Sequence, residues 1–391
     1  MSTASAAAPL ARILGDLARE GSLYERLPER AVRCYACGHR CFIPEGRPGI
    51  CKVRTNDGGM LKVPWGYVGA LQCDPIEKKP FFHALPGALA LSFGMLGCDY
   101  HCGYCQNWIT SQAIRDPRAV ATPQRVTPEE LADRAVRLGA PVIASTYNEP
   151  LITSEWAAEV FRAARDRGLV GAYISNGNGT DEVLEFIRPW VSLYKIDLKS
   201  FRDRTYRSLG GTLNNVLETV AAVHRKGFWL EIVTLLVPGF NDSPGEVRDI
   251  ARFIRAVSAD IPWHVTAFHK DYRMTDPDDT PARTLEAAAA IGMEEGLRFV
   301  YAGNRPGRVG RLEDTRCPSC AATLIARNGY RIERYRLTPA GSCPDCSTAI
   351  AGFWAGGVRH RASESPATGE VSTRPGEAAA GRPGGGPPGA R

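Results

Sequence analysis

Apolar segments of strand length alternate with helical patterns from about residue 88 to residue 305. About seven such segments stand out, namely ALALSFGML, PVIASTY, GAYIS, VSLYKI, LEIVTLLV, WHVTAF and LRFVYA. Continuous apolar strands separated by helices indicate a parallel sheet that is covered by helices. Seven units favour a full or partial β/α barrel over a short doubly wound sheet. In such a barrel, function gathers at the carboxyl ends of the strands.

Capping residues mark where the intervening helices begin and end. The segments TPEE at 127–130 and SPGE at 243–246 each combine a hydroxyl N-cap, a proline at the first helical position and a glutamate at the third. This combination predicts helix starts at both places. Gly168 and Gly227 follow helical patterns and are expected to end them.

Changes in composition divide the chain into five parts. The barrel is flanked by two segments rich in Cys, Gly and Pro, whose turn residues predict loops and short strands. The final segment is dominated by Gly, Pro, Ala, Ser and charge, which leaves little to bury. We therefore expect a helical lead-in at 1–32, a Cys-rich module at 33–86, the barrel at 87–305, a second Cys-rich module at 306–358 and a disordered tail at 359–391.

Overall composition narrows the classes of protein that are compatible with this chain. Hydrophobic residues make up 44% of the 391 residues, so a core can form without disulfides. The net charge of +6 is spread out, and without a run of Lys and Arg or a stacking platform it does not indicate nucleic-acid binding or modification. Neither a signal peptide nor a membrane-spanning apolar run is visible, so we expect a cytoplasmic protein with no membrane partner.

The twelve cysteines fall into three sets with one residue left over. Clustered cysteines in a reducing compartment usually hold metal. The sets are the N-terminal set (Cys34, Cys37, Cys41 and Cys51), the three-cysteine set (Cys98, Cys102 and Cys105) and the C-terminal set (Cys317, Cys320, Cys343 and Cys346). Cys73 stands alone, and we expect it to be a small buried side chain.

The three-cysteine set lies directly after the first barrel strand, with the spacing C-x3-C-x2-C. A structural zinc site is closed by four ligands, whereas a catalytic metal site keeps a position open. Three thiolates on a four-iron cluster would leave one iron free for a small molecule. The alternatives are a zinc site completed by His101 and thiols that bind no metal. The aromatic Tyr104 before the last cysteine favours the cluster.

The two flanking sets each offer four thiolates, which is typical of a closed site. Paired CxxC turns in the C-terminal set predict a zinc ribbon-like module, with rubredoxin-like iron as the alternative. For the N-terminal set, zinc is the first expectation and an auxiliary iron–sulfur cluster is its competitor. In either case His39 could replace one thiolate.

Several segments together resemble a known family. CDYHCGYC after a barrel strand resembles the signature of the radical S-adenosylmethionine (radical SAM) superfamily. DPIEKKPFFHALPG, CGYCQNWITSQ, TYNEP, DLKSF, LVPGFND and YAGN, in this order, resemble the radical SAM enzyme of the AmmeMemoRadiSam system, a group related to pyruvate formate-lyase activating enzyme. The resemblance spans residues 33 to about 355. It implies a radical SAM type of barrel, a 4Fe–4S cluster on Cys98, Cys102 and Cys105, and S-adenosylmethionine bound at the free iron.

The resemblance also implies contacts to S-adenosylmethionine at the strand ends. The residues concerned are Tyr104, Tyr147, Asn148, Glu149, Ser175, Asn176, Gly177, Asp197, Lys199, Pro238 and His269. YNEP takes the place of a GGEP-like motif that receives the methionine ammonium, and Ile174 stands where the activating enzyme has an Asp of a cation site. One alternative is that these strand ends are plain turns. Another is that Asp197 and Lys199 form an internal ion pair, because two residues spaced by two share one face of a strand.

Two functions are compatible with these patterns. The first is a radical SAM enzyme that cleaves S-adenosylmethionine reductively to a 5′-deoxyadenosyl radical. Its substrate would be an unknown protein or small molecule, with glycyl-radical activation as one form, and its reductant a flavodoxin or ferredoxin. The second is a non-catalytic metal-binding scaffold with three zinc sites.

Overall fold

The computed structural model describes residues 10–354 and 357–359. Its centre is an eight-stranded sheet in the order β16-β15-β14-β13-β12-β11-β9-β8. Neighbouring strands from β9 to β16 pair in parallel, and β8 pairs antiparallel with β9 at one edge. All seven apolar segments predicted as strands are strands of this parallel array, so the α/β prediction is confirmed in its partial, barrel-like form.

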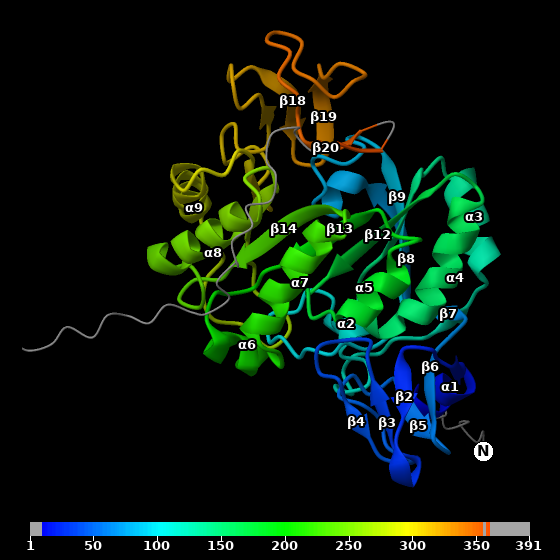
Figure 1. The fold of residues 1–391 in the computed structure, drawn as a ribbon. Helices are drawn as coiled ribbons and strands as arrows, with labels where there is room; N and C mark the ends of the chain where they lie inside the picture. The colour runs from blue at the N-terminus through cyan, green and yellow to red at the C-terminus, as the bar shows by residue number, and fades with distance from the viewer. Residues whose placement is uncertain (1–9, 355–356, 360–391) are drawn as a thin grey trace, which may run out of the picture.

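The sheet strands and the helices between them form the barrel part of the chain (Figure 1). The strands are β8 (Ala70–Pro75), β9 (Leu89–Gly94), β11 (Val142–Ser145), β12 (Val170–Ser175), β13 (Leu193–Asp197), β14 (Trp229–Leu236), β15 (Trp263–Ala267) and β16 (Val300–Gly303). The helices are α2 (Trp108–Ser111), α3 (Pro128–Arg137), α4 (Ser154–Arg165), α5 (Asp181–Ile187), α6 (Asp203–Leu209), α7 (Leu213–Arg225), α8 (Pro244–Val257) and α9 (Ala282–Glu294).

The predicted helix caps are present. Thr127 and Glu130 form a reciprocal capping box at the start of α3. Ser243 accepts a hydrogen bond from the backbone of Glu246 at the start of α8. Gly168 and Gly227 have φ values of 73° and 76°, a conformation that glycine adopts without strain just after a helix.

The N-terminal module contains more strand than the sequence indicated. Of the lead-in predicted at 1–32, residues 1–9 lie outside the described residues and the α-helix is limited to α1 (Leu10–Asp16). The remainder supplies strands to two small sheets, because β1 pairs with β6 and β2 pairs with β3. The sheet strands are β1 (Ala18–Glu20), β5 (Thr55–Asp57) and β6 (Met60–Pro64) in one sheet, and β2 (Tyr24–Arg26), β3 (Val32–Cys34) and β4 (Phe42–Ile43) in the other.

A buried ion pair fastens this module to the barrel. The guanidinium of Arg54 donates to both carboxylate oxygens of Glu155 on α4, at 2.6 and 2.7 Å, and to the carbonyl of Ile152 at 3.0 Å. Both side chains are almost fully buried, at 1% and 5% exposed. A bidentate geometry of this kind compensates for the loss of hydration of both charges.

The C-terminal module lies at the opposite end of the sheet from the N-terminal module (Figure 1). Its strands are β17 (Thr315–Arg316), β18 (Thr323–Asn328), β19 (Arg331–Tyr335), β20 (Gly352–Trp354) and β21 (Gly357–Arg359). Residues of the module share a buried cluster with the first residues of several sheet strands, such as Ala90 and Leu193. The module therefore covers the amino ends of the parallel strands.

A segment that precedes β9, residues 76–85, packs in the same buried cluster and is called the lumen segment below. Its backbone is held by Glu231 of β14, whose carboxylate accepts hydrogen bonds from the amides of Phe82 and His83, both at 2.9 Å. The same carboxylate accepts from Trp229 at 3.0 Å and bonds His264 at 2.7 Å. Glu231 thus anchors the lumen segment inside the barrel.

Cys73, expected to be buried, is half-buried on β8, because β8 is an edge strand and one of its sides is not covered by another strand. Among the described residues, no helix is long and apolar enough to cross a membrane. The predicted disordered tail at 359–391 lies outside the described residues apart from Arg359.

Candidate functional site

A cavity of about 370 Å³ lies at the carboxyl ends of the parallel strands. Most of the residues predicted for the site line it together: Cys98, Cys102, Tyr104, Cys105, Tyr147, Asn148, Glu149, Ser175, Asn176, Asp197 and Lys199. These residues come from the loops after four different strands. The cavity therefore lies where the strand-end argument predicted a site, and the side chains that line it include residues implied by the resemblance.

The loop after β9 carries the three cysteines that face the cavity. The hydroxyl of Ser111 lies 3.2 Å from the sulfur of Cys105, and the amide of Tyr100 donates to the sulfur of Cys98 at 3.4 Å. Burial raises the pKa of all three thiols, that of Cys102 to about 12. Buried thiols of this kind become thiolates when a metal centre supplies the positive charge.

The same three sulfurs are not collected around a single point. Within residues 10–354 and 357–359, the C-terminal set is the one group of three or more Cys, His, Asp or Glu ligand atoms that all lie within 4.8 Å of one another. His101, the alternative fourth ligand, is exposed and lies against Gly210. Three open, soft thiol ligands on one cavity fit a cluster of several irons better than a single zinc ion.

Asp99, which the sequence analysis did not single out, fixes the three-cysteine loop to the end of β12. Its side chain is fully buried and accepts hydrogen bonds from the side-chain amides of Asn176 and Asn178, both at 2.8 Å. The only sequence signal for this contact was the pair of asparagines spaced by two in the segment SNGNG. This contact sets the position of Cys98 relative to the strand ends.

The YNEP segment after β11 has an unusual backbone. Tyr147 has a φ of 67°, a left-handed conformation that a side chain with a Cβ atom rarely adopts. Two contacts hold it there, since the hydroxyl of Thr110 donates to the Tyr147 carbonyl and the ammonium of Lys79 donates to the Tyr147 hydroxyl at 2.9 Å. The Asn148 side chain accepts from the amide of Met95 at 3.0 Å. The backbone of this segment is therefore fixed in a conformation in which glycine would be expected.

Glu149 joins the loops after β11 and β12. Its carboxylate accepts from the Ser175 hydroxyl at 2.7 Å, the Asn176 amide at 2.8 Å and the Leu151 amide at 3.1 Å. Burial, reinforced by the nearby charge of Asp99, raises the pKa of Glu149 to about 8 despite these donors. The carboxyl is thus used to position two cavity loops.

Asp197 and Lys199 are paired and also line the cavity, so the two alternatives for this pair hold together. The ammonium of Lys199 lies 3.4 Å from one Asp197 oxygen, and Lys195 donates to the other. Lys195 was missed, although its spacing of two from Asp197 places it on the same face of β13. Burial lowers the pKa of Lys195, whereas for Lys199 the charge of Asp197 outweighs burial and raises the pKa.

A further wall of the cavity was not predicted at residue level. It includes Lys78, Lys79, Asn304 and Tyr330, of which Tyr330 belongs to the C-terminal module. Lys78 and Lys79 both bond the single carboxylate of Asp74, at 2.9 and 3.3 Å. In the sequence, the segments DPIEKKPF and YAGN were part of the family resemblance. No role in the site was assigned to their residues.

Three predicted residues do not line the cavity. Gly177 lies just behind it, where its amide donates to the Ser175 hydroxyl at 3.1 Å. Pro238 is half-buried outside the lining, and His269 is exposed, with its ring nitrogen 3.3 Å from the carbonyl of Lys270. Contacts of Pro238 and His269 with a cofactor remain predictions that the geometry of the cavity does not support.

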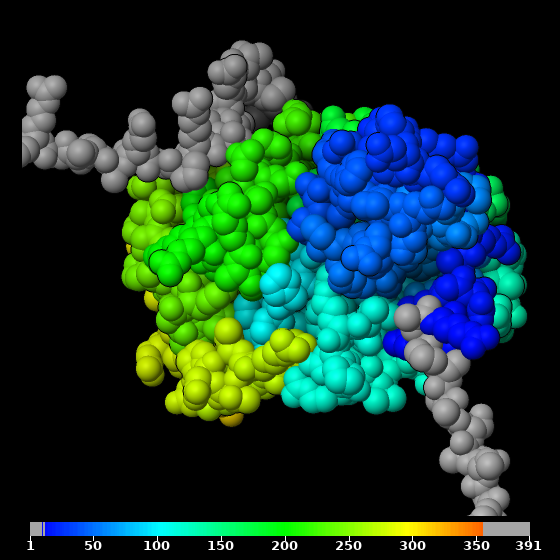
Figure 2. All heavy atoms as spheres, turned by 90° about the horizontal axis from the view of Figure 1, so that it is seen from below, coloured from blue at the N-terminus to red at the C-terminus, as the bar shows by residue number. Residues whose placement is uncertain are grey.

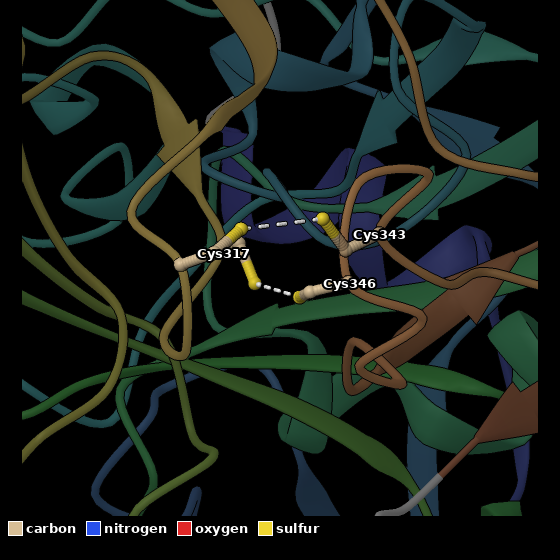
Figure 3. Close-up of side chains that lie close together, drawn as sticks. Cys317, Cys343 and Cys346 are labelled. Atoms are coloured by element: carbon tan, nitrogen blue, oxygen red, sulfur yellow. Dashed lines mark hydrogen bonds between the residues drawn. The ribbon is translucent and has the colours of Figure 1, made fainter.

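The four sulfurs of the C-terminal set come together as the paired CxxC turns predicted (Figure 3). Cys317 lies 3.5 Å from Cys346, and Cys320 lies 3.6 Å from Cys343. This group could hold a metal ion. Four thiolates would leave no open coordination position, which is typical of a structural site.

Comparisons with known proteins agree with this geometry. A sequence profile of the Radical SAM superfamily matches residues 94–254. An uncharacterized protein of Methanocaldococcus jannaschii is 39% identical over 312 residues, which are 79% of this chain and 91% of that protein. Isethionate sulfite-lyase activating enzyme of Oleidesulfovibrio alaskensis is 28% identical over 122 residues, 30% of this chain and 40% of that enzyme.

Among solved structures, a domain of pyruvate-formate lyase-activating enzyme from Bacteroides vulgatus aligns with 41% of this chain and 98% of its own, at 18% identity and a TM-score of 0.36. The profile match starts at the end of β9 and includes the three-cysteine loop and the YNEP segment. The radical SAM resemblance is thereby confirmed, and a domain of this kind implies S-adenosylmethionine and an iron–sulfur cluster. The chain belongs to the radical SAM superfamily.

Proposed function

We propose that the chain is an enzyme that cleaves S-adenosylmethionine reductively at a 4Fe–4S cluster held by Cys98, Cys102 and Cys105. The observation that carries the proposal is that these three thiols, and no fourth cysteine, line the strand-end cavity. When bound and reduced by one electron, such a cluster would supply the electron that splits the cosubstrate into methionine and a 5′-deoxyadenosyl radical for hydrogen abstraction.

The residues around the cavity would orient the cosubstrate. Thr110 donates to the Tyr147 carbonyl and Lys79 to the Tyr147 hydroxyl, so this segment is held in place, and its backbone carbonyls can accept hydrogen bonds from the methionine ammonium. Lys199 can bind the methionine carboxylate, with Asp197 holding it in place. Glu149 acts as a positioning residue, because its carboxylate is already occupied by three donors.

The electron donor would be a one-electron carrier protein such as a flavodoxin or ferredoxin. The acceptor of the radical is a protein or a small molecule. The similarity to an activating enzyme supports hydrogen abstraction from a glycine of a partner protein as one form of the reaction. The scaffold with three zinc sites is not favoured, because among the described residues the three-cysteine set is not a group of ligand atoms within 4.8 Å of one another, whereas the C-terminal set is.

The test is formation of 5′-deoxyadenosine by the protein purified without air, reconstituted with iron and sulfide, and reduced in the presence of S-adenosylmethionine. The variant Cys98→Ala/Cys102→Ala/Cys105→Ala should form none, whereas Cys73→Ala, a thiol outside the cavity, should match the wild type. A protein that takes up zinc instead of a cluster at the three cysteines would overturn the proposal.

A further inference from the structure

The three cysteine sets of this chain differ in how closely their sulfurs approach. A zinc ion with four thiolates at about 2.3 Å separates neighbouring sulfurs by about 3.8 Å. The C-terminal set has this spacing, with sulfur pairs at 3.5 and 3.6 Å. In the described part of the chain, neither the N-terminal set nor the three-cysteine set brings three sulfurs within 4.8 Å of one another.

The C-terminal set thus shows the spacing of thiolates that share one ion. The three-cysteine set, for which a cluster is proposed above, lacks this spacing, and within the described residues the N-terminal set lacks it too. The N-terminal set also provides the four thiolates that a complete iron–sulfur cluster uses. We propose that Cys34, Cys37, Cys41 and Cys51 hold an iron–sulfur cluster, the second of the chain, and not a zinc ion.

The surroundings of the N-terminal set agree with a closed, four-thiolate site. Cys34, Cys37 and Cys51 are between 5% and 6% exposed, and Cys41 is half-buried. His39, which the sequence offered as a replacement ligand, has its Nε2 atom 3.3 Å from the carbonyl of Asp99 in the three-cysteine loop. The four cysteines are therefore sufficient for the cluster, and His39 serves as a contact to the neighbouring loop.

The loops of the two sets are in direct contact. The guanidinium of Arg115 donates to the carbonyl of Ile50 at 2.6 Å and to the carbonyl of Cys98 at 2.7 Å. Because Ile50 precedes Cys51, this side chain bridges the N-terminal set and the three-cysteine set. At Gly97 a Cβ atom would lie 2.8 Å from the Val53 side chain and 3.4 Å from the Cys51 carbonyl. Only glycine allows this approach without displacing the neighbours.

A second contact fixes the other side of the N-terminal set. The amide of Gly38, next to Cys37, donates to the carbonyl of Asn178 at 2.8 Å, and the Asn178 side chain bonds Asp99. Figure 2 shows the N-terminal module, in blue, packed beside the cyan segment around residue 100. The two clusters would therefore be neighbours across a rigid contact.

Adjacent clusters can exchange a single electron. Given the proposed function, the N-terminal cluster would lose one electron and be oxidised, and the cluster on the three-cysteine set would gain it and be reduced. A reduced flavodoxin or ferredoxin would restore the electron to the N-terminal cluster. This exchange assigns the N-terminal module a redox role in addition to its structural one.

The experiment is elemental analysis and electron paramagnetic resonance of the full-length protein purified without air and reconstituted. The decisive variant is Cys98→Ala/Cys102→Ala/Cys105→Ala, which keeps all four N-terminal cysteines. It should retain about two to four irons, matching sulfide, about one zinc and a signal after reduction. A variant that holds no iron and about two zincs would overturn the proposal.

A second variant tests the assignment from the other side. The variant Cys37→Ser/Cys51→Ser should lose the iron of the N-terminal set and keep the iron of the three-cysteine set. Should this variant fail to fold, the triple variant alone decides the question. In the reduced wild type, a signal broadened relative to the sum of the two variants supports close neighbours, and a signal equal to that sum contradicts them. Zinc in the N-terminal set together with 5′-deoxyadenosine formation would refute this inference while leaving the proposed function intact.

Discussion

Replacing Glu231 with alanine should destabilise the protein more than almost any other single change in the barrel. The carboxylate is fully buried and interacts with the amides of Phe82 and His83, the indole of Trp229 and the ring of His264. Burial opposes ionisation, but the bond from His264 and the nearby charges hold the pKa of Glu231 below its usual value. The native site is therefore built around a charged acceptor.

The magnitude follows from the number of donors that lose their partner. A buried donor left without an acceptor costs about 1–3 kcal/mol. Four donors give about 4 kcal/mol or more for Glu231→Ala, a large part of the stability of a typical domain. Glu231→Gln keeps one acceptor oxygen, which can still serve His83 and Trp229, but it leaves the amide of Phe82 and the ring of His264 without an acceptor. Its cost should therefore be about half that of alanine, about 2 kcal/mol or more.

The assay is thermal and urea unfolding of the metal-loaded protein, with Glu129→Ala as the matched control. Glu129 is exposed on α3 and should change the free energy of unfolding by less than about 1 kcal/mol. Faster tryptic cleavage after Lys78 in Glu231→Ala would show that the lumen segment has been released. The anchoring role would be refuted if Glu231→Ala lowered the free energy of unfolding by less than about 1 kcal/mol and the order of the three variants in this free energy were reversed.

Three further predictions concern other parts of the molecule. Arg54→Ala should cost about 3–5 kcal/mol because it leaves Glu155 buried and unpaired, whereas Arg40→Ala, which removes the exposed pair with Glu182, should cost less than about 1 kcal/mol in the same unfolding assay. Burial lowers the pKa of His83 to about 4 from 6.5, so the unfolded chain binds a proton between these pH values and the folded chain does not. Stability should fall by about 3 kcal/mol as the pH falls through that window, and this fall should be absent from the melting profile of His83→Gln. Removal of the metal from the C-terminal set by a chelator should lower the melting temperature, whereas an unchanged melt of demonstrably metal-free protein would contradict a structural site there.

The strands and the cysteine sets could be predicted because their signals are local. Each parallel strand is buried on both faces, which requires a continuous apolar run such as LEIVTLLV. The caps at Thr127 and Ser243 depend on residues three positions apart. The four sulfurs of the C-terminal set meet because each CxxC turn directs two thiols to one point.

The lumen segment and the backbone at Tyr147 could not be predicted because they depend on contacts between distant residues. Glu231 bonds a backbone nearly 150 positions earlier in the chain, and nothing near Glu231 or Phe82 indicates this pairing. Tyr147 adopts a left-handed conformation that costs about 1–2 kcal/mol, and the contacts that hold it come from Lys79 and Thr110, which are distant in the sequence. For the same reason the lysines of the lumen segment were not recognised as part of the cavity wall.

The two Cys-rich modules act on opposite ends of the sheet, and this division explains how the cavity is kept in shape. The N-terminal module holds the three-cysteine loop through Arg115 and the loop after β12 through Asn178, at the carboxyl ends of the strands. The C-terminal module closes the amino ends over the lumen segment and also contributes Tyr330 to the cavity. The side chain of Lys79 extends from the lumen segment to the hydroxyl of Tyr147. A change that loosens the amino end of the barrel should therefore also loosen the loop that is expected to bind the methionine ammonium. The lumen segment and the site are thus linked by the hydrogen bond between Lys79 and Tyr147 and by the lysines that the segment contributes to the cavity wall.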